Sequence, residues 1–209
     1  MNMADEKLIA LTFDDGPNTV TTPRVLDILE KYCTVGSFFL VGNCINDESA
    51  RAAERANKMG CEICNHSRTH AAMPELSPEE IRSEIEYTSK LCEAISGYTP
   101  AFFRPPYIAV NDVMFDNIDL PFICGYGCND WVDTVSVDER VERVLAQACH
   151  GAIILLHDYE GNEKTVEALD KIIPALRSEG YSFVTVSDLF MRCGVEPKKG
   201  IVYSCVFDK

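Results

Sequence analysis

The sequence lacks any apolar run of membrane-spanning length and any cluster of Lys and Arg. Its 19 basic residues are outnumbered by 33 acidic ones, which gives a formal net charge of −14. Because nucleic-acid phosphates and anionic lipid surfaces attract clustered cations, this balance argues against nucleic acid and membranes as partners. The hydrophobic content of 46% is that of an ordinary globular protein.

An export signal is missing as well. The apolar run Leu8–Leu11 is too short for the hydrophobic region of a signal peptide, and the acidic residues Asp5 and Glu6 precede it. We therefore expect a cytoplasmic protein, unless an export segment has been removed. Because linkers, repeats and low-complexity segments are also missing, residues 1–209 are expected to form a single domain that buries a full core.

Cysteine is abundant, with ten residues, but a chain of this size does not need disulfide staples. Cys33, Cys92, Cys124 and Cys149 are scattered through apolar stretches, where a free thiol behaves as a small buried hydrophobe. Only Cys61–Cys64 has a suggestive spacing. Residues three apart in a strand point to opposite faces, so we expect structural cysteines rather than a redox or zinc site.

Strand-like and helix-like segments alternate along the chain. Strands are expected at Leu8–Phe13, Val35–Val41, Cys61–His66, Ala101–Arg104, Pro121–Gly125, Ala152–Leu156 and Ser182–Val186. Helices are expected at Thr22–Tyr32, Glu48–Lys58, Pro78–Ile95, Val137–Cys149 and Thr165–Glu179, with a short one after the last strand. This alternation predicts an α/β fold of parallel strands covered by helices. A barrel would gather the carboxyl ends of its strands, where active sites lie.

Two segments of the sequence carry metal-site chemistry. Asp14 and Asp15 follow the first strand and precede a Gly-Pro turn, while His66 and His70 are four residues apart and can share one face. Taken singly, the first segment is an ordinary turn and the second an accidental spacing. Taken together, one carboxylate and two imidazoles make a three-ligand metal site with positions open for water. The second aspartate is then free to move protons.

Three further motifs follow in order: Arg104–Tyr107, Asp130–Trp131 and Leu155–Asp158. With Thr12–Pro17 and His66–His70, these five motifs resemble the polysaccharide deacetylases, which are carbohydrate esterases of family 4 with the nodulation-type chitooligosaccharide deacetylase homology domain. The resemblance covers nearly the whole chain. It implies an irregular (β/α)7 barrel with the active site at the carboxyl ends of the strands.

The resemblance assigns Asp15, His66 and His70 to a divalent metal, usually zinc, and Asp14 to the general base. It places Arg104 against Asp14, and a guanidinium suits this task because its charge is permanent and its fork matches a carboxylate. The ordinary alternatives are a capped turn for the aspartates and a structural strand histidine for His66. The presence of both aspartates and both histidines favours the metal site.

The resemblance also implies the groups around the leaving amine and the acetyl group. His157 is the general acid, and Asp130 holds and charges it, since a carboxylate partner raises the pKa of a histidine. The backbone N–H of Tyr107 is an oxyanion donor. Trp131 helps to wall the pocket around the acetyl methyl group, and Leu155 is a further substrate-binding residue. The alternatives are a rigid surface turn at Arg104–Tyr107, a solvated pair at the end of a strand for His157 and Asp158, and a core position for Trp131, the only tryptophan.

The sequence departs from the family pattern at three positions. Gly127 stands where another Asp is frequent, Ile108 follows Tyr107 where Gly is common, and Cys64 replaces a common Gly two residues before His66. We expect Ile108 to narrow the cleft and Cys64 to crowd the metal. Both changes bear on substrate size more than on the chemistry.

These observations predict a metal-dependent N-deacetylase that removes acetyl groups from oligosaccharides or polysaccharides containing N-acetylglucosamine. The first alternative is a related deformylase or acyl-amide hydrolase acting on a small or lipid-linked substrate. The second is a non-catalytic sugar-binding relative, and the third is zinc storage or redox activity through the cysteines. No sequence signal indicates the physiological metal, the sugar chain length or the oligomeric state.

Overall fold

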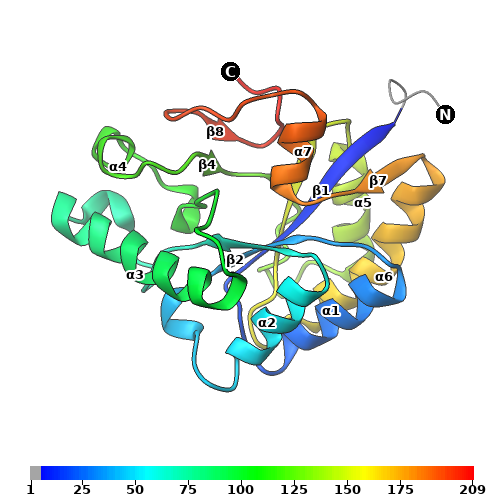
Figure 1. Ribbon diagram of the computed structural model, residues 1–209. Helices are drawn as coiled ribbons and strands as arrows, with labels where there is room; N and C mark the ends of the chain where they lie inside the picture. Colours follow the sequence, from blue (N-terminus) through cyan, green and yellow to red (C-terminus); the bar gives the residue numbers. More distant parts are fainter. Residues whose placement is uncertain (1–5) are drawn as a thin grey trace.

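The computed structural model describes residues 6–209, so Asp5 lies outside the described residues. The sheet is built around its first strand (Figure 1). Its six strands are β1 (Lys7–Asp14), β2 (Ser37–Leu40), β3 (Glu62–Asn65), β5 (Tyr126–Gly127), β6 (Ala152–His157) and β7 (Tyr181–Phe183). β1 pairs in parallel with β2, β6 and β7, while β3 pairs with β2 and β5 pairs with β6. The predicted α/β fold with a parallel sheet is thus confirmed.

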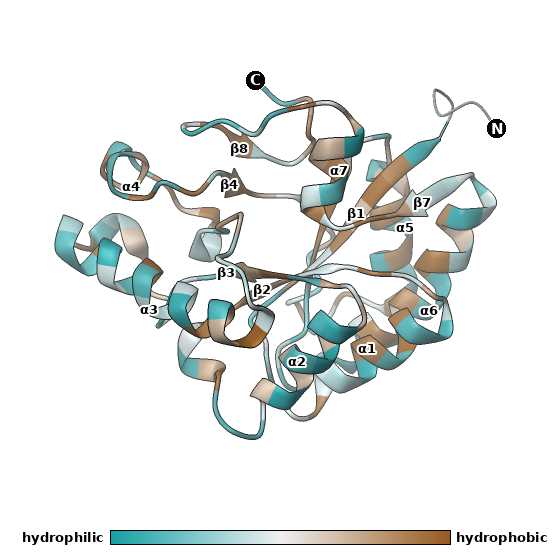
Figure 2. Cartoon of the chain, in the orientation of Figure 1, coloured by the Kyte–Doolittle hydropathy of each residue, from teal (hydrophilic) through white to brown (hydrophobic). Residues whose placement is uncertain are grey.

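Seven α-helices and three 3₁₀ helices occur in the described chain. The α-helices are α1 (Thr21–Lys31), α2 (Ala50–Lys58), α3 (Pro78–Ser96), α4 (Asp112–Asn117), α5 (Val137–Gln147), α6 (Glu163–Ser178) and α7 (Val186–Arg192). The 3₁₀ helices are η1 (Gly42–Cys44), η2 (Met73–Glu75) and η3 (Pro106–Ile108). In Figure 2, β1 is brown along most of its length, whereas the surrounding helices alternate brown and teal segments, as amphipathic helices do. None of the helices described here is long and apolar enough to span a membrane.

The two faces of β1 contribute to different cores. Ile9, Leu11 and Phe13 pack into the core between the sheet and helices such as α1 and α6. Leu8 and Ala10 belong to a second core on the inner face of the sheet. Because side chains alternate along a strand, Asp14 continues the inner row and emerges at the carboxyl end of β1.

The same alternation places groups from β6 beside those of β1. Ile153 of β6 belongs to the inner core, so Leu155 and His157 follow it on the inner face. The register pairs Asp14 directly with His157. Asp14 and His157 are distant in sequence but are therefore neighbours at the carboxyl end of the sheet.

The short strands differ most from the sequence prediction. The strand expected at 101–104 is wrong, because Phe103 alone forms isolated bridges that connect Asn65 of β3 to Phe122. Two prolines follow at once and leave no N–H groups to continue a ladder. β4 contains only Phe122–Ile123 and pairs with β8 (Val202–Tyr203). Three elements, β5, β8 and α4, were not predicted from the sequence.

The cysteines confirm the prediction only in part. Cys92 is buried and Cys124 half-buried, but Cys33 and Cys149 are exposed, because both lie just beyond the carboxyl ends of helices. As predicted, the two cysteines point to opposite faces of the sheet. Cys61, directly before β3, packs into the core beneath the helices, and Cys64 of β3 packs into the core on the inner face.

Candidate active site

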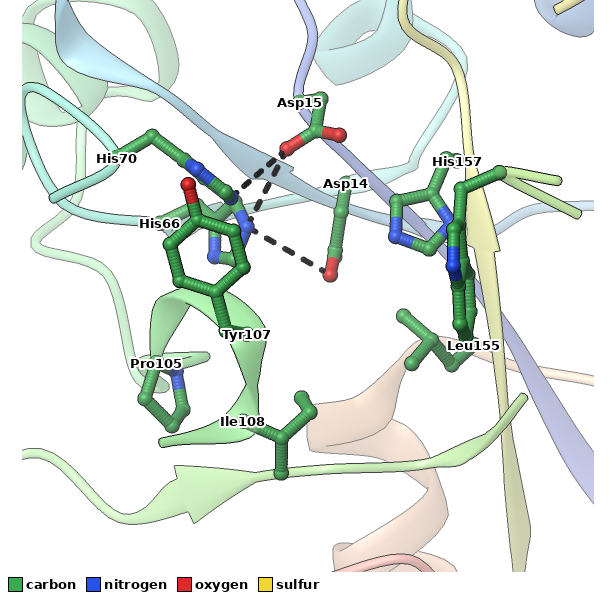
Figure 3. A pocket seen from close by; sticks show the side chains of 10 residues that line it. Asp14, Asp15, His66, His70, Pro105, Tyr107, Ile108, Leu155 and His157 are labelled. Atoms are coloured by element: carbon green, nitrogen blue, oxygen red, sulfur yellow. Dashed lines mark ion pairs between the residues drawn. The ribbon is translucent and has the colours of Figure 1, made fainter. Parts of the chain in front are cut away.

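Asp15, His66 and His70 bring their side chains together at the carboxyl end of the sheet (Figure 3). Single ligand atoms from the three residues all lie within 4.8 Å of one another. The Oδ1 atom of Asp15 is 3.5 Å from Nε2 of His66 and 3.3 Å from Nε2 of His70. Zn²⁺ accepts imidazole and carboxylate ligands, and three of them leave further positions open. The donor set therefore fits a divalent metal.

The protonation of these groups also suits metal binding. His66 directly follows β3, and its Nδ1 lies 2.7 Å from the carbonyl oxygen of Arg104. A carbonyl only accepts, so Nδ1 donates to it, and Nε2 is the ring nitrogen directed towards Asp15 and the metal site. Burial lowers the pKa of His70 and so favours its neutral ring. Burial raises the pKa of Asp15, but hydrogen bonding and charge from His66 outweigh this effect and lower it.

A buried carboxylate on α3 holds the loop between the two histidines. Glu84 accepts hydrogen bonds of 2.8 Å from the backbone N–H groups of Arg68 and Thr69, and one of 2.9 Å from the Thr69 hydroxyl. The sequence prediction missed Glu84 because a helical glutamate usually faces solvent. Its spacing from Ile81 and Thr88, which are both buried, places it on the inner stripe of α3 and could have revealed it.

Asp14 and Arg104 form a buried ion pair beneath the proposed metal site. The Nη1 atom of Arg104 lies 2.6 Å from Oδ1 of Asp14, and the two side chains are 0% and 3% exposed. The guanidinium also lies over the ring of Phe39, 4.1 Å from its centroid. Because Oδ1 is held by Arg104, Oδ2 of Asp14 faces the site, 3.8 Å from Nε2 of His66.

His157 and Asp130 form a second buried pair across the cavity. The Nδ1 atom of His157 lies 2.8 Å from Oδ1 of Asp130, and the His157 backbone N–H donates to Oδ2 over 2.8 Å. Burial lowers the pKa of His157, but the hydrogen bond and charge of Asp130, with the charges of Asp14 and Asp15, raise it overall to about 9. The ring is therefore protonated at neutral pH, with Nε2 left to donate.

Asp158 supports the turn that carries the two aspartates. Its backbone N–H donates to the carbonyl oxygen of Asp14 over 3.0 Å, and its Oδ2 accepts from the Thr22 hydroxyl over 2.5 Å. Burial raises the pKa of Asp158 to about 7. A Cβ atom at Gly16 would lie 2.6 Å from this carboxyl, so only glycine fits at that position.

These groups surround a cavity of about 370 Å³. Its lining residues are Asp14, Asp15, His66, His70, Pro105, Tyr107, Ile108, Trp131, Leu155 and His157. Every predicted site residue lines this cavity except Arg104 and Asp130, which contact Asp14 and His157 from behind. The structure thus brings the whole predicted set together, and the residues Tyr107 and Trp131 are 70% and 49% exposed.

The three departures from the family pattern have different consequences. Ile108 lines the cavity, as expected of a residue that narrows it. Cys64 lies in the inner core and not along the cavity, so the expected crowding of the metal is not observed. A Cβ atom at Gly127 would lie 3.7 Å from the Trp131 ring, so this glycine lies beneath the tryptophan.

Comparison with known proteins assigns the family. The polysaccharide deacetylase family model matches residues 2–119. The chain belongs to the polysaccharide deacetylase family. The predicted classification as a hydrolase of this family is therefore confirmed.

Among its relatives is a bifunctional xylanase/deacetylase from Pseudobutyrivibrio xylanivorans, 50% identical over 94% of this chain and 32% of that protein. A peptidoglycan-N-acetylglucosamine deacetylase from Bacillus cereus is 37% identical over 88% of this chain and 89% of its own length. The chain spans about a third of the length of the xylanase/deacetylase.

A solved structure shows the same fold. The family 4 acetyl xylan esterase from Clostridium thermocellum, determined in complex with a cobalt ion, superposes with a TM-score of 0.92. It is 42% identical, and the match covers 96% of this chain and all of that chain. This agreement confirms the fold class that the resemblance implied.

Proposed function

We propose that this chain is a metal-dependent deacetylase that removes N-acetyl groups from oligosaccharides or polysaccharides containing N-acetylglucosamine. One observation carries the proposal: a three-ligand site, a carboxylate base and a charged histidine face the same cavity. A non-catalytic sugar-binding relative does not need all three. We further propose that residues 1–209 form one catalytic domain.

Asp15, His66 and His70 would hold the metal, and their mixed nitrogen and oxygen donors favour zinc. When bound, such an ion supplies Lewis-acid polarisation and lowers the pKa of water. Both histidine Nε2 atoms and Oδ1 of Asp15 already converge, so little rearrangement is needed to bind it. The cobalt ion in the esterase relative is consistent with a divalent ion here.

The remaining groups move the protons of amide hydrolysis. Asp14 takes the proton of the attacking water, while Arg104 pairs with the carboxylate and orients it. His157 then donates its Nε2 proton to the nitrogen of the leaving amine, because a neutral amine is a far better leaving group than an amide anion. Asp130 fixes the ring through Nδ1. The Tyr107 N–H contributes an oxyanion donor.

Removal of O-acetyl groups from xylan is the second candidate function. It is favoured by similarity to the bifunctional xylanase/deacetylase, at 50% identity, and to the acetyl xylan esterase, at 42% identity. The same residues serve both reactions, although an ester leaving group needs less help from an acid than an amine does. Deformylation and hydrolysis of small or lipid-linked amides remain the alternatives within the hydrolase class.

A substrate panel tests the proposal. Acetate or formate release is measured on N-acetyl chitooligosaccharides, acetylated xylooligosaccharides, and formylated and cyclic amides. We expect the chitooligosaccharides to have the highest kcat/KM, with activity lost after chelation and restored by Zn²⁺ or Co²⁺. His70→Ala should lose both metal binding and activity. Full activity in metal-free protein would contradict the proposed chemistry, and a preference for xylan would favour the second candidate.

A further inference from the structure

Arg140 on α5 is a buried cation without a carboxylate partner in the described part of the chain. It is 1% exposed, and the ion pairs of residues 6–209 do not include it. By contrast, the other fully buried guanidinium, that of Arg104, pairs directly with Asp14. Burying an unpaired charge is expensive, so its surroundings must compensate for it.

The hydrogen bonds of Arg140 lead towards the proposed general acid. Its Nη1 donates to Oδ1 of Asn162 over 2.7 Å and to the Thr165 hydroxyl oxygen over 2.9 Å. Thr165 in turn donates its hydroxyl proton to Oδ2 of Asp130 over 2.8 Å, and Nδ2 of Asn162 lies 3.3 Å from the same oxygen. The Nδ2 group also donates to the carbonyl oxygen of His157 over 2.9 Å. Arg140 is thus one side chain away from Asp130 along two routes.

The direction of these bonds follows from the chemistry of arginine. A guanidinium has donors and no acceptor, so it can only occupy lone pairs on Thr165 and Asn162. A hydroxyl has one proton, and with its oxygen accepting from Arg140 that proton is free for Asp130. The amide of Asn162 is fixed in the same way, with its carbonyl towards Arg140 and its NH₂ towards Asp130.

We propose that Arg140 is a positioning residue for the general acid, because it forces Thr165 and Asn162 to present donors to Asp130. With Oδ2 saturated by these donors and by the His157 backbone N–H, only Oδ1 of Asp130 remains for the imidazole. Asp130 then holds the ring in one orientation, with Nε2 towards the cavity. This inference rests on the proposed role of His157 in amide hydrolysis.

Thr165 offers a matched test, since Arg140→Gln by itself could also unfold the protein. Thr165→Val removes one route at nearly constant volume, and Thr165→Ser keeps the hydroxyl. We expect Thr165→Val to lower kcat on an N-acetyl chitooligosaccharide about tenfold, a fraction of the about 10²- to 10⁴-fold that a general acid contributes. KM and the kcat for an activated acetyl ester should change less than twofold, and Thr165→Ser should restore the amide activity.

Two further variants complete the test. Arg140→Gln should show the same selective loss on the amide. Arg143→Gln, one turn along α5 on a half-exposed side chain paired with Glu139, should match the wild type. Equal losses of Thr165→Val on amide and ester, or no loss on either, would overturn the inference.

An NMR measurement separates this inference from the proposed function. In metal-free, ¹⁵N-labelled protein, the Nδ1–H proton of His157 should give a slowly exchanging downfield resonance, because it is held by Asp130. Thr165→Val and Arg140→Gln should broaden or abolish it, and Thr165→Ser should retain it. An unchanged resonance in both variants would overturn the inference even if the substrate proposal failed.

Discussion

The proposed metal-ligand side of the cavity and its proposed proton-transfer side are built differently. Two of the three proposed metal ligands, Asp15 and His70, lie on loops, have left-handed backbone angles of φ 75° and 59°, and leave 26% and 28% of their side chains exposed. The third, His66, directly follows β3 and is 3% exposed. Asp14 and His157 end adjacent strands, and their side chains are 3% and 14% exposed. Asp14 forms an ion pair with buried Arg104, and His157 forms one with buried Asp130.

This difference follows from what each group must do. A metal ligand needs a free lone pair and an approach route for the ion, which loops at the edge of the sheet provide. A general base or acid needs a fixed side-chain orientation and a suitable protonation state. A position at the end of a strand fixes the orientation, and a buried partner of opposite charge stabilises the charged form. The loops are supported from behind by Glu84 and Asp158, so they also have fixed positions.

Exchanging Asp14 and Asp15 in turn for Asn is the strongest way to test this division. Asp14→Asn should lower kcat by about 10²- to 10⁴-fold, because an amide cannot take the proton, while metal content stays near one ion per chain. Asp15→Asn should instead weaken metal binding. Metal content by mass spectrometry and kcat at saturating metal distinguish the two. If both variants lost the metal alike, the division between the two sides would be wrong.

Removing the proposed general acid, His157, should give the next largest loss of kcat, and only on substrates with a poor leaving group. His157→Ala should lower kcat on an N-acetyl substrate by about 10²-fold or more, and should affect an activated acetyl ester much less. Metal affinity should not change, because His157 is not among the three grouped ligand residues. Parallel kinetics on the two substrates provide the measurement. Equal losses would assign His157 to binding rather than to proton donation.

The buried carboxyl group of Asp158 should make the stability of the metal-free protein depend on pH. Asp158 has a folded-state pKa of about 7, raised by burial from an ordinary value of 3.8, so between these values the folded chain holds a proton that the unfolded chain releases. Stability should therefore fall as pH rises, by about 1.4 kcal/mol per pH unit between about pH 5 and 7, and level off above.

Asp158→Asn removes that titration. Urea unfolding from pH 5 to 8 should show a flatter profile for the variant than for the wild type, with the variant the more stable at pH 8. Parallel profiles for the two proteins would show that Asp158 ionises normally and does not behave as a buried neutral support.

The smallest predicted effect concerns the cavity wall. Ile108 has a left-handed backbone with φ 54°, which is unfavourable for a β-branched residue. Ile108→Gly should relieve this strain and stabilise the fold by about 1 kcal/mol, measured by urea unfolding. Ile108→Ala keeps the strain and serves as the control for the lost side chain. A glycine variant less stable than the alanine variant would contradict the argument.

The sequence was most informative where the pattern was long or chemically unusual. Strands β1 and β6 could be predicted from their apolar runs, and the residues at their carboxyl ends, Asp14 and His157, lie in the site. Two-residue strands such as β5 and β8 have no periodicity of their own and depend on pairing partners far along the chain. The helical spacing of Glu84 could have indicated that it faces the core, but the contacts of Glu84 and Arg140 join segments far apart in the sequence, so only the packed structure reveals what they bind.

The position of β1 at the centre of the sheet has a consequence for biosynthesis. Its partners β6 and β7 are encoded near the other end of the chain, and Asp14 pairs in register with His157. At the usual rate of synthesis, the ribosome needs about 7 to 30 s to add the residues between those two. Throughout that interval β1, apolar on both faces, has no strand to cover one of its edges. A chain terminated before β6 would therefore leave one edge of β1 unpaired, and unpaired strand edges of this kind favour aggregation.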